Sequence, residues 1–249
     1  MPELSLQHHN VLITGAARRL GAQTARTLHA NGANIAIHYR SSSIEADELV
    51  ADLNAQRAGS AIAVQADILN LDSHAGLVQQ VVDAFGGLSV LINNASTFYP
   101  TPVGTITEQH WDDLMGSNLK GPLFLAQAAA PELTKARGAI INMVDIHATR
   151  PLGEHVVYCC AKAGVHMLTE SLAVELGPHV RVNGIAPGPI MWPENDIDKA
   201  EKNAITDTTL LKRTGEATDI AQAALYFLAH APFVTGQILA IDGGRSLRP

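Results

Sequence analysis

The sequence predicts an α/β protein built on one doubly wound parallel sheet of about seven strands. Short apolar runs alternate with helical patterns along the whole chain of 249 residues. The hydrophobic fraction is 47% but the aromatic fraction is only 4%, which is typical of the aliphatic core around a buried parallel sheet. No internal repeat and no low-complexity linker interrupts the alternation, so we expect a single domain, residues 1–249.

The expected strands are short and apolar, and helical patterns separate most of them. They lie at residues 11–13, 35–39, 62–65, 90–93, 139–144, 181–186 and 237–241. The expected helices lie at residues 20–31, 44–57, 71–85, 108–134, 158–176 and 216–231. Ser43 is the expected N-cap of the second helix, and Pro122 and Pro131 are expected to bend the long fourth helix or to mark turns in it. This alternation predicts a sheet covered on both faces, with right-handed crossovers.

A polar insertion follows the sixth strand, at about residues 189–212. Its part from Trp192 to Lys212 is rich in charged residues and has no strand pattern. Loops that bind ligands lie outside the rigid elements of a fold and frequently close over the bound molecule. We therefore expect this insertion to form a lid over the active edge of the sheet.

Charge and composition exclude several classes of protein. The net charge of −7 and the pI near 5.8 argue against a nucleic-acid partner held by bulk electrostatics. No apolar run approaches the roughly 20 residues that span a bilayer, and the polar N-terminus has no signal-peptide pattern. Cys159 and Cys160 are neighbours in a helical pattern and are not expected to pair, which fits a reducing cytoplasm. His8 and His9 have no partner at metal-ligand spacing, so we expect no metal.

The turn between the first strand and the first helix, Thr14-Gly-Ala-Ala-Arg-Arg-Leu-Gly21, has the pattern of a dinucleotide phosphate turn. In such a turn a pyrophosphate lies against the N–H groups that open the helix. Gly15 allows the tight turn, and Gly21 allows the helix to pack closely on the strand. A glycine expected between them is replaced by Arg19, a cation that would lie over the phosphates or reach into the substrate pocket. The cofactor-binding residues expected here are Gly15, Arg18, Arg19, Leu20 and Gly21.

The end of the second strand indicates which dinucleotide binds. An acidic residue there would bind the ribose hydroxyls of NAD, but the sequence reads Tyr39-Arg-Ser41. Arg40 offers a planar charged fork and Ser41 a hydroxyl, and both suit a 2′-phosphate. We therefore expect NADP(H), bound by Tyr39, Arg40 and Ser41. Asp67 and Ile68, at the end of the third strand, are placed to contact the adenine.

Three chemically active residues follow the fifth strand. Asp145 ends that apolar run, and Tyr158 and Lys162 lie four residues apart in the next helical pattern, which puts both on one helix face. An ammonium beside a phenol favours the phenolate, so we expect Lys162 to lower the pKa of Tyr158 from its ordinary value of about 10. A tyrosine tuned in this way is a candidate general acid.

Together these motifs resemble the short-chain dehydrogenase/reductase family across essentially the whole chain. The resemblance rests on Thr14–Gly21, Asp67, Asn93–Ala95, Asn118, Tyr158 with Lys162, and Pro187-Gly188. It implies a Rossmann-type fold and a homotetramer, with the last strand and the tail, residues 242–249, at a subunit interface.

The resemblance also implies roles for these residues. Tyr158 would donate the proton, and Lys162 would bind the nicotinamide ribose and tune Tyr158. Asn118 would complete a proton relay. The residues expected to border the cofactor elsewhere are Asn93, Asn94, Ala95, Pro187, Gly188 and Ile190.

Two departures from the common family pattern narrow the resemblance. Asp145 stands where that pattern has a serine, and Arg19 stands where it has a glycine. These departures and the segments at residues 93–100 and 186–193 look like the pteridine reductase branch. In that branch Phe98 would stack on a pterin, Ser96 and Arg19 would contact the pterin or a cofactor phosphate, and Asp145 and Tyr158 would deliver protons. The expected substrate-binding residues are Arg19, Ser96, Phe98, Asp145, Tyr158, Pro189 and Trp192.

The chemistry of Asp145 supports the same branch. A carboxylate would repel the alkoxide that develops in carbonyl reduction, whereas reduction of a C=N bond requires a proton at nitrogen and no oxyanion hole. We expect NADPH-dependent reduction of a dihydropterin, such as dihydrobiopterin, to the tetrahydropterin, with oxidised pterin or folate as further substrates. The alternatives are a dihydromonapterin or dihydrofolate reductase, a carbonyl (3-oxoacyl) reductase, and an NADPH-binding sensor without activity.

Overall fold

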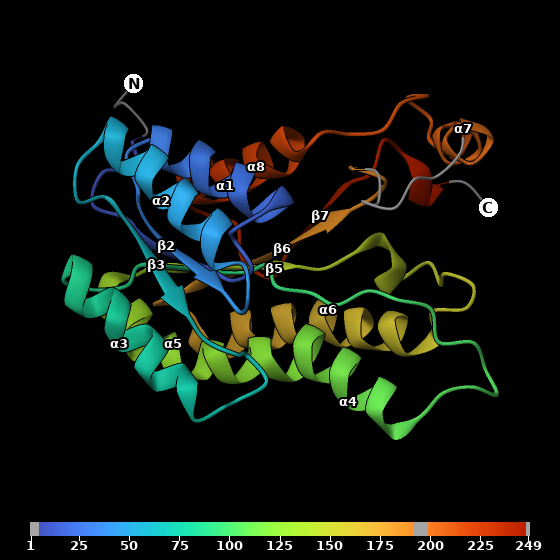
Figure 1. Ribbon diagram of the computed structural model, residues 1–249, viewed down its shortest axis with the longest axis horizontal. Helices are drawn as coiled ribbons and strands as arrows, with labels where there is room; N and C mark the ends of the chain where they lie inside the picture. The colour runs from blue at the N-terminus through green and yellow to red at the C-terminus, as the bar shows by residue number, and fades with distance from the viewer. Residues whose placement is uncertain (1–4, 192–198, 248–249) are drawn as a thin grey trace.

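The structure, a computed structural model, describes residues 5–191 and 199–247. Within these ranges a seven-stranded sheet lies between two layers of helices (Figure 1). The strands are β1 (Asn10–Ile13), β2 (Asn34–Tyr39), β3 (Ala61–Gln65), β4 (Val90–Asn93), β5 (Ala139–Met143), β6 (Arg181–Pro187) and β7 (Ile238–Ile241). Their order is β3-β2-β1-β4-β5-β6-β7, and every neighbouring pair is parallel. The predicted fold class is confirmed.

The helices cover the sheet on both faces (Figure 1). One layer contains α1 (Arg19–Ala30), α2 (Ser43–Gln56) and α8 (Ala217–Leu225). The other layer contains α3 (Ser73–Phe85), α4 (Glu108–Met115), α5 (Gly121–Ala136) and α6 (Val156–Leu176). The helix α7 (Lys199–Thr208) lies at one end of the molecule, close to the C-terminal segment (Figure 1). None of the described helices is both long and apolar enough to cross a membrane.

The strands are apolar on both sides because both sides of the sheet are buried. Successive residues of a strand point to opposite faces. Val11 and Ile13 therefore pack in one cluster with Leu28 of α1, while Leu12 packs in the other cluster with Leu125 of α5. Complete burial of such a side chain contributes about 1.5–3 kcal/mol, so these two clusters fix the sheet and its helices together.

The strand order places the candidate site. From β1 the chain moves outward to β2 and β3, and then returns to the other side of β1 as β4. Adjacent crossovers run in opposite directions at β1 and β4, and this opens a crevice at the carboxyl ends of the two strands. The residues that emerge at this crevice are Thr14 and Gly15 after β1 and Asn94 and Ala95 after β4.

The largest errors in the predicted elements concern two helices. The helix predicted at 108–134 is α4 and α5 joined by one turn of π-helix, η1 (Gly116–Lys120), and the helix at 216–231 is α8 followed by a second π-turn, η3 (Tyr226–His230). A π-turn adds a residue to the helical repeat without interrupting its apolar pattern, so the sequence does not reveal it. Pro122 lies in the first turn of α5, and Pro131 lies inside that helix.

One smaller expectation is also corrected, and the expected lid stays a prediction. Ser43 is the first residue of α2 rather than its cap, and Ser42 precedes the helix without a capping side-chain bond. The expected lid contains α7, and its residues 192–198 lie outside the described part of the chain.

Candidate active site

A cavity of about 380 Å³ lies at the crevice between β1 and β4. Most of the predicted cofactor-binding residues line it: Gly15, Arg18, Arg19, Leu20, Gly21, Tyr39, Arg40, Ser41, Ile68, Asn94, Ala95 and Ser96. The sequence analysis missed six further lining residues: Ala17, His38, Ser42, Leu69, Thr97 and Ser117. Thus segments that follow β1, β2, β3 and β4 form one elongated site.

The phosphate turn has the close backbone packing that such a turn requires. Gly15 has φ +60°, and a Cβ built there would lie 3.0 Å from the Cα of Ala95. A Cβ on Gly21 would lie 2.6 Å from the carbonyl oxygen of Gly15. The Nδ2 of Asn94 donates hydrogen bonds to the carbonyl oxygens of Thr14 (2.8 Å) and Gly15 (3.0 Å). A larger side chain at either glycine would displace the turn.

The open N-terminus of α1 fits an anion. Arg18 precedes the helix and makes no side-chain cap, and the first turn contains no acidic residue. The first N–H groups of a helix have no partners within the helix, and its N-terminus carries a partial positive charge. Because Arg18 and Arg19 line the same cavity, the region suits a negatively charged group such as a pyrophosphate.

Arg19 has a positive φ, a backbone conformation that glycine adopts more readily than other residues. Its φ is +53°, in the left-handed region, which costs a residue with a side chain on the order of 1 kcal/mol. Arg19 lines the 380 Å³ cavity, and its expected contact with the cofactor phosphates stays a prediction. Arg19 does not belong to the lining of the second cavity described below, so its expected contact with substrate has no support there.

The part of the cavity where adenine contacts are expected differs in detail from the expectation. Ile68 and Leu69 line it, whereas Asp67 does not. The Asp67 carboxylate instead accepts a hydrogen bond of 2.9 Å from the backbone N–H of Leu69. Asp67 therefore shapes the loop that carries Ile68 and Leu69.

A second cavity, of about 210 Å³, adjoins the end of β5. Its lining residues are Phe98, Asp145, Ile146, His147, Tyr158, Pro187, Gly188, Pro189 and Arg245. Asp145 uses both carboxylate oxygens: Oδ1 accepts from the backbone N–H of His147 (2.8 Å), and Oδ2 accepts from the Tyr158 hydroxyl (2.8 Å). One oxygen thus caps a short 3₁₀ turn, η2 (Ile146–Ala148), and the other holds the phenolic proton.

The expected effect of Lys162 on Tyr158 is wrong in this structure. Burial and the nearby Asp145 carboxylate raise the pKa of Tyr158 well above its ordinary value, and a contribution from Ser96 in the opposite direction is smaller. The Lys162 ammonium lies 5.6 Å from the centre of the tyrosine ring and donates to the carbonyl oxygen of Met143 (2.9 Å). Burial lowers the pKa of Lys162 to about 8, partly opposed by Asp145. Tyr158 therefore keeps its proton at neutral pH.

Asn118 lies in η1 and belongs to a short chain of hydrogen bonds. Its Oδ1 accepts from the Ser96 hydroxyl (2.6 Å), and its Nδ2 donates to the carbonyl oxygens of Thr97 (3.0 Å) and Leu114 (2.9 Å). Asn118 is 1% exposed and lines neither cavity. Ser96 also contributes a hydrogen bond to Tyr158, so Asn118 is connected to the tyrosine through Ser96. No direct bond joins Asn118 to Lys162 in the part of the chain described.

Phe98 presents an aromatic ring to the second cavity. The ring stacks on His155, with 4.6 Å between centres and 14° between planes, and meets the edge of Tyr158 at 4.8 Å. Its side chain is still 56% exposed, an unusual value for a phenylalanine. The contacts with His155 and Tyr158 fix the ring as an apolar surface beside Asp145.

The remaining predicted residues are distributed around these two cavities. Pro187, Gly188 and Pro189 line the second one, whereas Lys162 and Ile190 line neither. Trp192 lies outside the described residues. Among the residues that the structure does describe, no group of three or more His, Cys, Asp or Glu side chains is placed to hold a metal ion.

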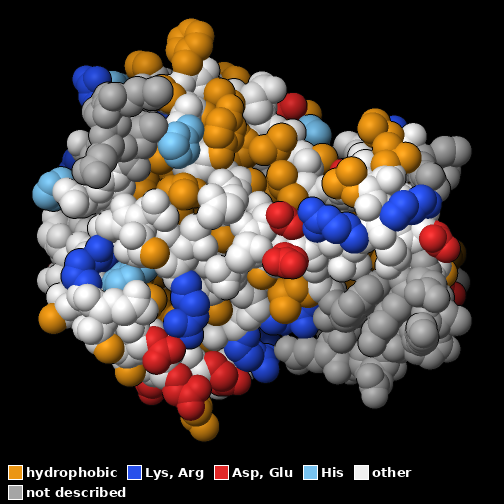
Figure 2. Space-filling model, turned by 90° about the horizontal axis from the view of Figure 1, so that it is seen from above, with side chains coloured by type: hydrophobic (Ala, Val, Ile, Leu, Met, Phe, Trp, Pro, Cys, Tyr) orange, Lys and Arg blue, Asp and Glu red, His pale blue; other side chains and the backbone are white. Residues whose placement is uncertain are grey.

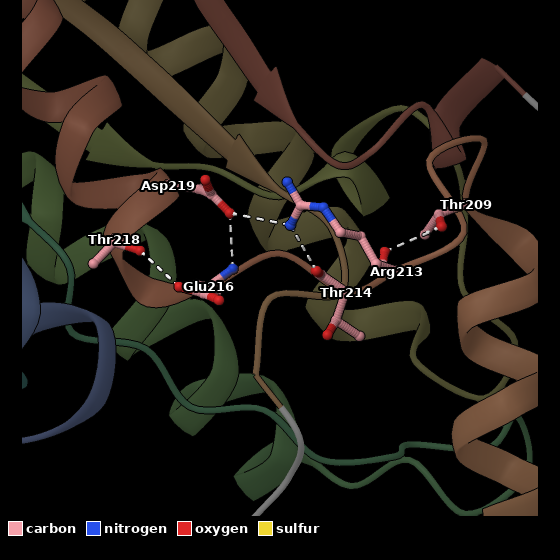
Figure 3. Close-up of polar contacts among 6 residues, drawn as sticks. All are labelled: Thr209, Arg213, Thr214, Glu216, Thr218 and Asp219. Carbon is pink, nitrogen blue, oxygen red and sulfur yellow. Dashed lines mark hydrogen bonds and ion pairs between the residues drawn. The ribbon is translucent and has the colours of Figure 1, made fainter.

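Polar contacts hold the loop after α7 in shape (Figure 3). Arg213 pairs with Asp219 (3.8 Å), Thr209 donates to the carbonyl oxygen of Arg213 (3.1 Å), and Asp219 accepts from the backbone N–H of Glu216 (2.8 Å). The neighbouring N–H of Gly215 donates to the carbonyl oxygen of Pro189 (3.0 Å). The wall of the second cavity is therefore held from a distant part of the sequence.

His147 and Arg245 are two lining residues that the sequence analysis missed. His147 follows Asp145 by two residues, and its position next to a candidate catalytic carboxylate was a local signal. Arg245 had no such signal, because it comes from the C-terminal tail. The Asp242 carboxylate accepts from the N–H groups of Gly244 (2.8 Å) and Ser246 (2.7 Å), and this turn brings Arg245 to the cavity.

Known proteins are similar to this chain over nearly its whole length. Residues 15–246 match the family model described as enoyl-(acyl carrier protein) reductase. The chain is 34% identical to pteridine reductase 1 of Leishmania tarentolae, over 95% of this chain and 96% of that protein. It is also 34% identical to the 3-oxoacyl-acyl-carrier-protein reductase FabG of Staphylococcus aureus, over 94% and 97% of the two chains. A short chain dehydrogenase/reductase of Aspergillus oryzae, astE, is 31% identical over 98% and 97%.

The chain therefore belongs to the short-chain dehydrogenase/reductase family, an oxidoreductase family whose members use NAD(P)H. The family predicted from the motifs is confirmed. Relatives with two different substrates are equally similar to this chain, so the overall identity does not choose between those substrates.

The contact between Tyr158 and Asp145 makes a prediction about titration. Asp145→Asn removes the carboxylate charge that raises the pKa of Tyr158, so that pKa should fall toward its ordinary range. The measurement is the absorbance of tyrosinate during an alkaline titration. The chain has 4 tyrosines, and Tyr158→Phe measured in parallel identifies the contribution of this one.

Asp113→Asn is the matched control, because the Tyr99 hydroxyl donates to Asp113 (2.9 Å) in a similar pair. This control should change only the titration of Tyr99. An unchanged titration of Tyr158 in Asp145→Asn would show that the carboxylate does not govern the phenol.

Proposed function

We propose that this protein is an NADPH-dependent pteridine reductase that reduces a C=N bond of a dihydropterin to give the tetrahydropterin. The observation that carries the proposal is the Asp145–Tyr158 hydrogen bond of 2.8 Å in a cavity that also exposes the Phe98 ring. A flat heterocycle would stack on Phe98 and bring its imine nitrogen to the acidic pair. The similarity to a pteridine reductase supports the same reading.

The residues of the second cavity would supply the proton for this reaction. When bound, the nicotinamide supplies a hydride, which forms the new C–H bond. Tyr158 donates its hydroxyl proton to the substrate nitrogen, and solvent later returns a proton to the phenol. Asp145 holds that proton in place, and the charged Lys162 near the ring stabilises the phenolate left behind. The carboxylate does not need to stabilise an alkoxide, because none forms.

NADPH is the proposed cofactor because of the groups that line the first cavity at the end of β2. Arg40 and Ser41 are exposed there and line that cavity, and none of the described residues that line it is acidic. An arginine fork and a hydroxyl suit a 2′-phosphate, whereas ribose hydroxyls require a carboxylate acceptor. Lys162 would contact the nicotinamide ribose.

A second candidate substrate is dihydrofolate, and the position of Arg245 in the second cavity favours it. Arg245 lines the 210 Å³ cavity, and its guanidinium has no ion-pair partner among the described residues. A substrate with a carboxylate-bearing substituent would satisfy this charge. Dihydromonapterin, with an uncharged substituent, is a further candidate within the same activity.

The other two alternatives have less support. A 3-oxoacyl reductase agrees with the similarity to FabG, but Asp145 would oppose the alkoxide that forms in that reaction. A sensor that only binds NADPH would not require the set of Asn118, Asp145, Tyr158 and Lys162.

We also propose a homotetramer located in the cytoplasm. β7 is an edge strand on which Leu239 is exposed, and Tyr226 and Phe233 are exposed large hydrophobic residues. Figure 2, which looks down on the layer of α1, α2 and α8, shows hydrophobic side chains gathered on part of this face. An exposed edge strand and apolar patches of this kind favour contact with a second copy. Cys159 and Cys160 are free thiols, which suits a reducing compartment.

The substrate is tested with a panel and two variants. Wild type should oxidise NADPH with dihydrobiopterin, dihydromonapterin or dihydrofolate faster than with an acetoacetyl thioester. Phe98→Ala should raise KM for the pterin more than KM for NADPH, because an aromatic stack is worth about 0.5–1.5 kcal/mol beyond its buried area. Asp145→Ser should lower pterin turnover and leave NADPH binding intact in a fluorescence titration. Faster turnover of the thioester than of every pterin would contradict the proposal.

The cofactor is tested by Arg40→Asp, which removes a charged donor and adds a carboxylate. Losing a charged hydrogen bond costs about 1.5–3 kcal/mol, so the ratio of kcat/KM for NADPH over NADH should fall by roughly one to two decades. Lys135→Asp, on α5 in the opposite layer, makes the same change of charge and should leave the ratio unaltered. If Arg40→Asp also leaves it unaltered, the 2′-phosphate is held elsewhere.

The assembly is tested by Leu239→Lys at the exposed edge strand. Light scattering should give the mass of a tetramer for the wild type and a smaller assembly for the variant, because a charge at an edge opposes pairing between copies. A monomeric wild type would overturn this part of the proposal.

A further inference from the structure

His38 is a buried side chain that connects two walls of the first cavity. It lies in β2, is 2% exposed and lines the cavity. Its Nδ1 accepts a hydrogen bond of 3.1 Å from the backbone N–H of Gly15, and its Nε2 lies 3.1 Å from the carbonyl oxygen of Ala66. A carbonyl oxygen only accepts, so Nε2 carries the proton and the ring is neutral. One imidazole therefore holds both the phosphate turn and the loop that follows β3.

A second buried histidine holds the same loop. His74 lies in α3, is 2% exposed, and its Nε2 lies 3.0 Å from the carbonyl oxygen of Ile68. Two imidazoles, from a strand and from a helix, thus bind alternate carbonyl groups of the segment 66–68. Asp67 between them accepts from the N–H of Leu69, so side chains fix the loop from three sides.

We infer that His38 is a positioning residue for the cofactor: it sets the distance between the phosphate turn and the adenine loop, residues 66–69. His74 helps to hold the adenine loop through its bond to Ile68. The inference rests on the proposed function, because it assumes that a dinucleotide binds in the 380 Å³ cavity. Gly15 and Ile68 both line that cavity, and each belongs to a segment that one of the histidines holds. The two segments would contact the pyrophosphate and the adenine of one cofactor, so their separation governs its affinity.

The environment of His38 keeps its imidazole uncharged. Burial and, to a smaller extent, the nearby His74 lower the pKa of His38 to about 4. The bond to the Ala66 carbonyl and the charge of Asp67 act in the opposite direction and raise this pKa. The other charged groups that line the cavity are Arg18, Arg19 and Arg40. At neutral pH the imidazole therefore keeps one acceptor and one donor nitrogen, as its two contacts require.

The test measures the Kd of NADPH by fluorescence titration, together with kcat and KM, in four variants. His38→Phe keeps the ring shape but leaves the Gly15 N–H and the Ala66 carbonyl without partners, and His38→Gln restores one donor and one acceptor. His74→Phe removes only the bond to Ile68. His29→Phe is the control: His29 is also buried and bonded, to Ser60 (2.7 Å), but does not line the cavity.

His38→Phe should raise the Kd of NADPH about 10- to 100-fold, which corresponds to the loss of buried hydrogen bonds, while kcat at saturating NADPH stays within about twofold. His74→Phe should raise Kd less, and His38→Gln should recover part of the affinity. His29→Phe should lower the melting temperature without changing Kd. If His38→Phe does not fold, the same comparison is made between His38→Gln and wild type, with a Kd raised at least about threefold expected.

Two results would overturn the inference: a Kd for the His38 variant within twofold of wild type, or a His29→Phe variant that weakens NADPH binding as much as the His38 variant. Both of these comparisons require a wild-type protein that binds NADPH. If wild type binds no NADPH, the proposed function itself fails, and this outcome is distinct from the other two.

Discussion

The hydrogen bond between the Tyr158 hydroxyl and the Asp145 carboxylate is the contact on which the proposed chemistry depends, and several elements hold it in place. The two residues come from α6 and from the end of β5. Buried bonds join those elements: Lys162 donates to Met143 (2.9 Å), and Asn142 donates to Thr169 (3.0 Å). Because these donors and acceptors are buried, breaking one of them leaves a costly unpaired group. The position of the acidic pair is therefore fixed by the sheet and helix beneath it.

The same contact changes the role of the lysine. A Tyr-x-x-x-Lys pair on a helix favours a phenolate when the ammonium reaches the hydroxyl. Here the ammonium lies near the ring, while burial of the phenol and the carboxylate that faces its hydroxyl raise the pKa of Tyr158, so the phenol keeps its proton. A phenol that keeps its proton has a proton to give, which is what the proposed protonation of a substrate nitrogen requires. Tyr158 and Lys162 belong to the family motif, but burial and Asp145 together set the protonation state of Tyr158.

Substrate choice within this family depends on a few side chains around a shared scaffold. The chain is 34% identical both to a pteridine reductase and to a 3-oxoacyl reductase, so the identity over the whole chain does not separate them. Asp145, Phe98 and Arg245 all line the 210 Å³ cavity, and Asp145 would oppose the alkoxide that forms when a 3-oxoacyl group is reduced. The argument for a pterin is therefore an argument about that cavity and not about the fold.

The sequence by itself determined the alternation of strands and helices, the family, and most residues of the first cavity. These properties follow from local patterns: apolar periodicity, the turn from Thr14 to Gly21, and the residues after each strand, which meet at one edge of a parallel sheet. The tertiary structure decided the rest. Arg245 reaches the second cavity only through the turn built on Asp242, and His38 joins two loops that are distant in the sequence. The pKa of Tyr158 depends on burial and on the distance to Asp145, and no spacing in a sequence specifies either of them.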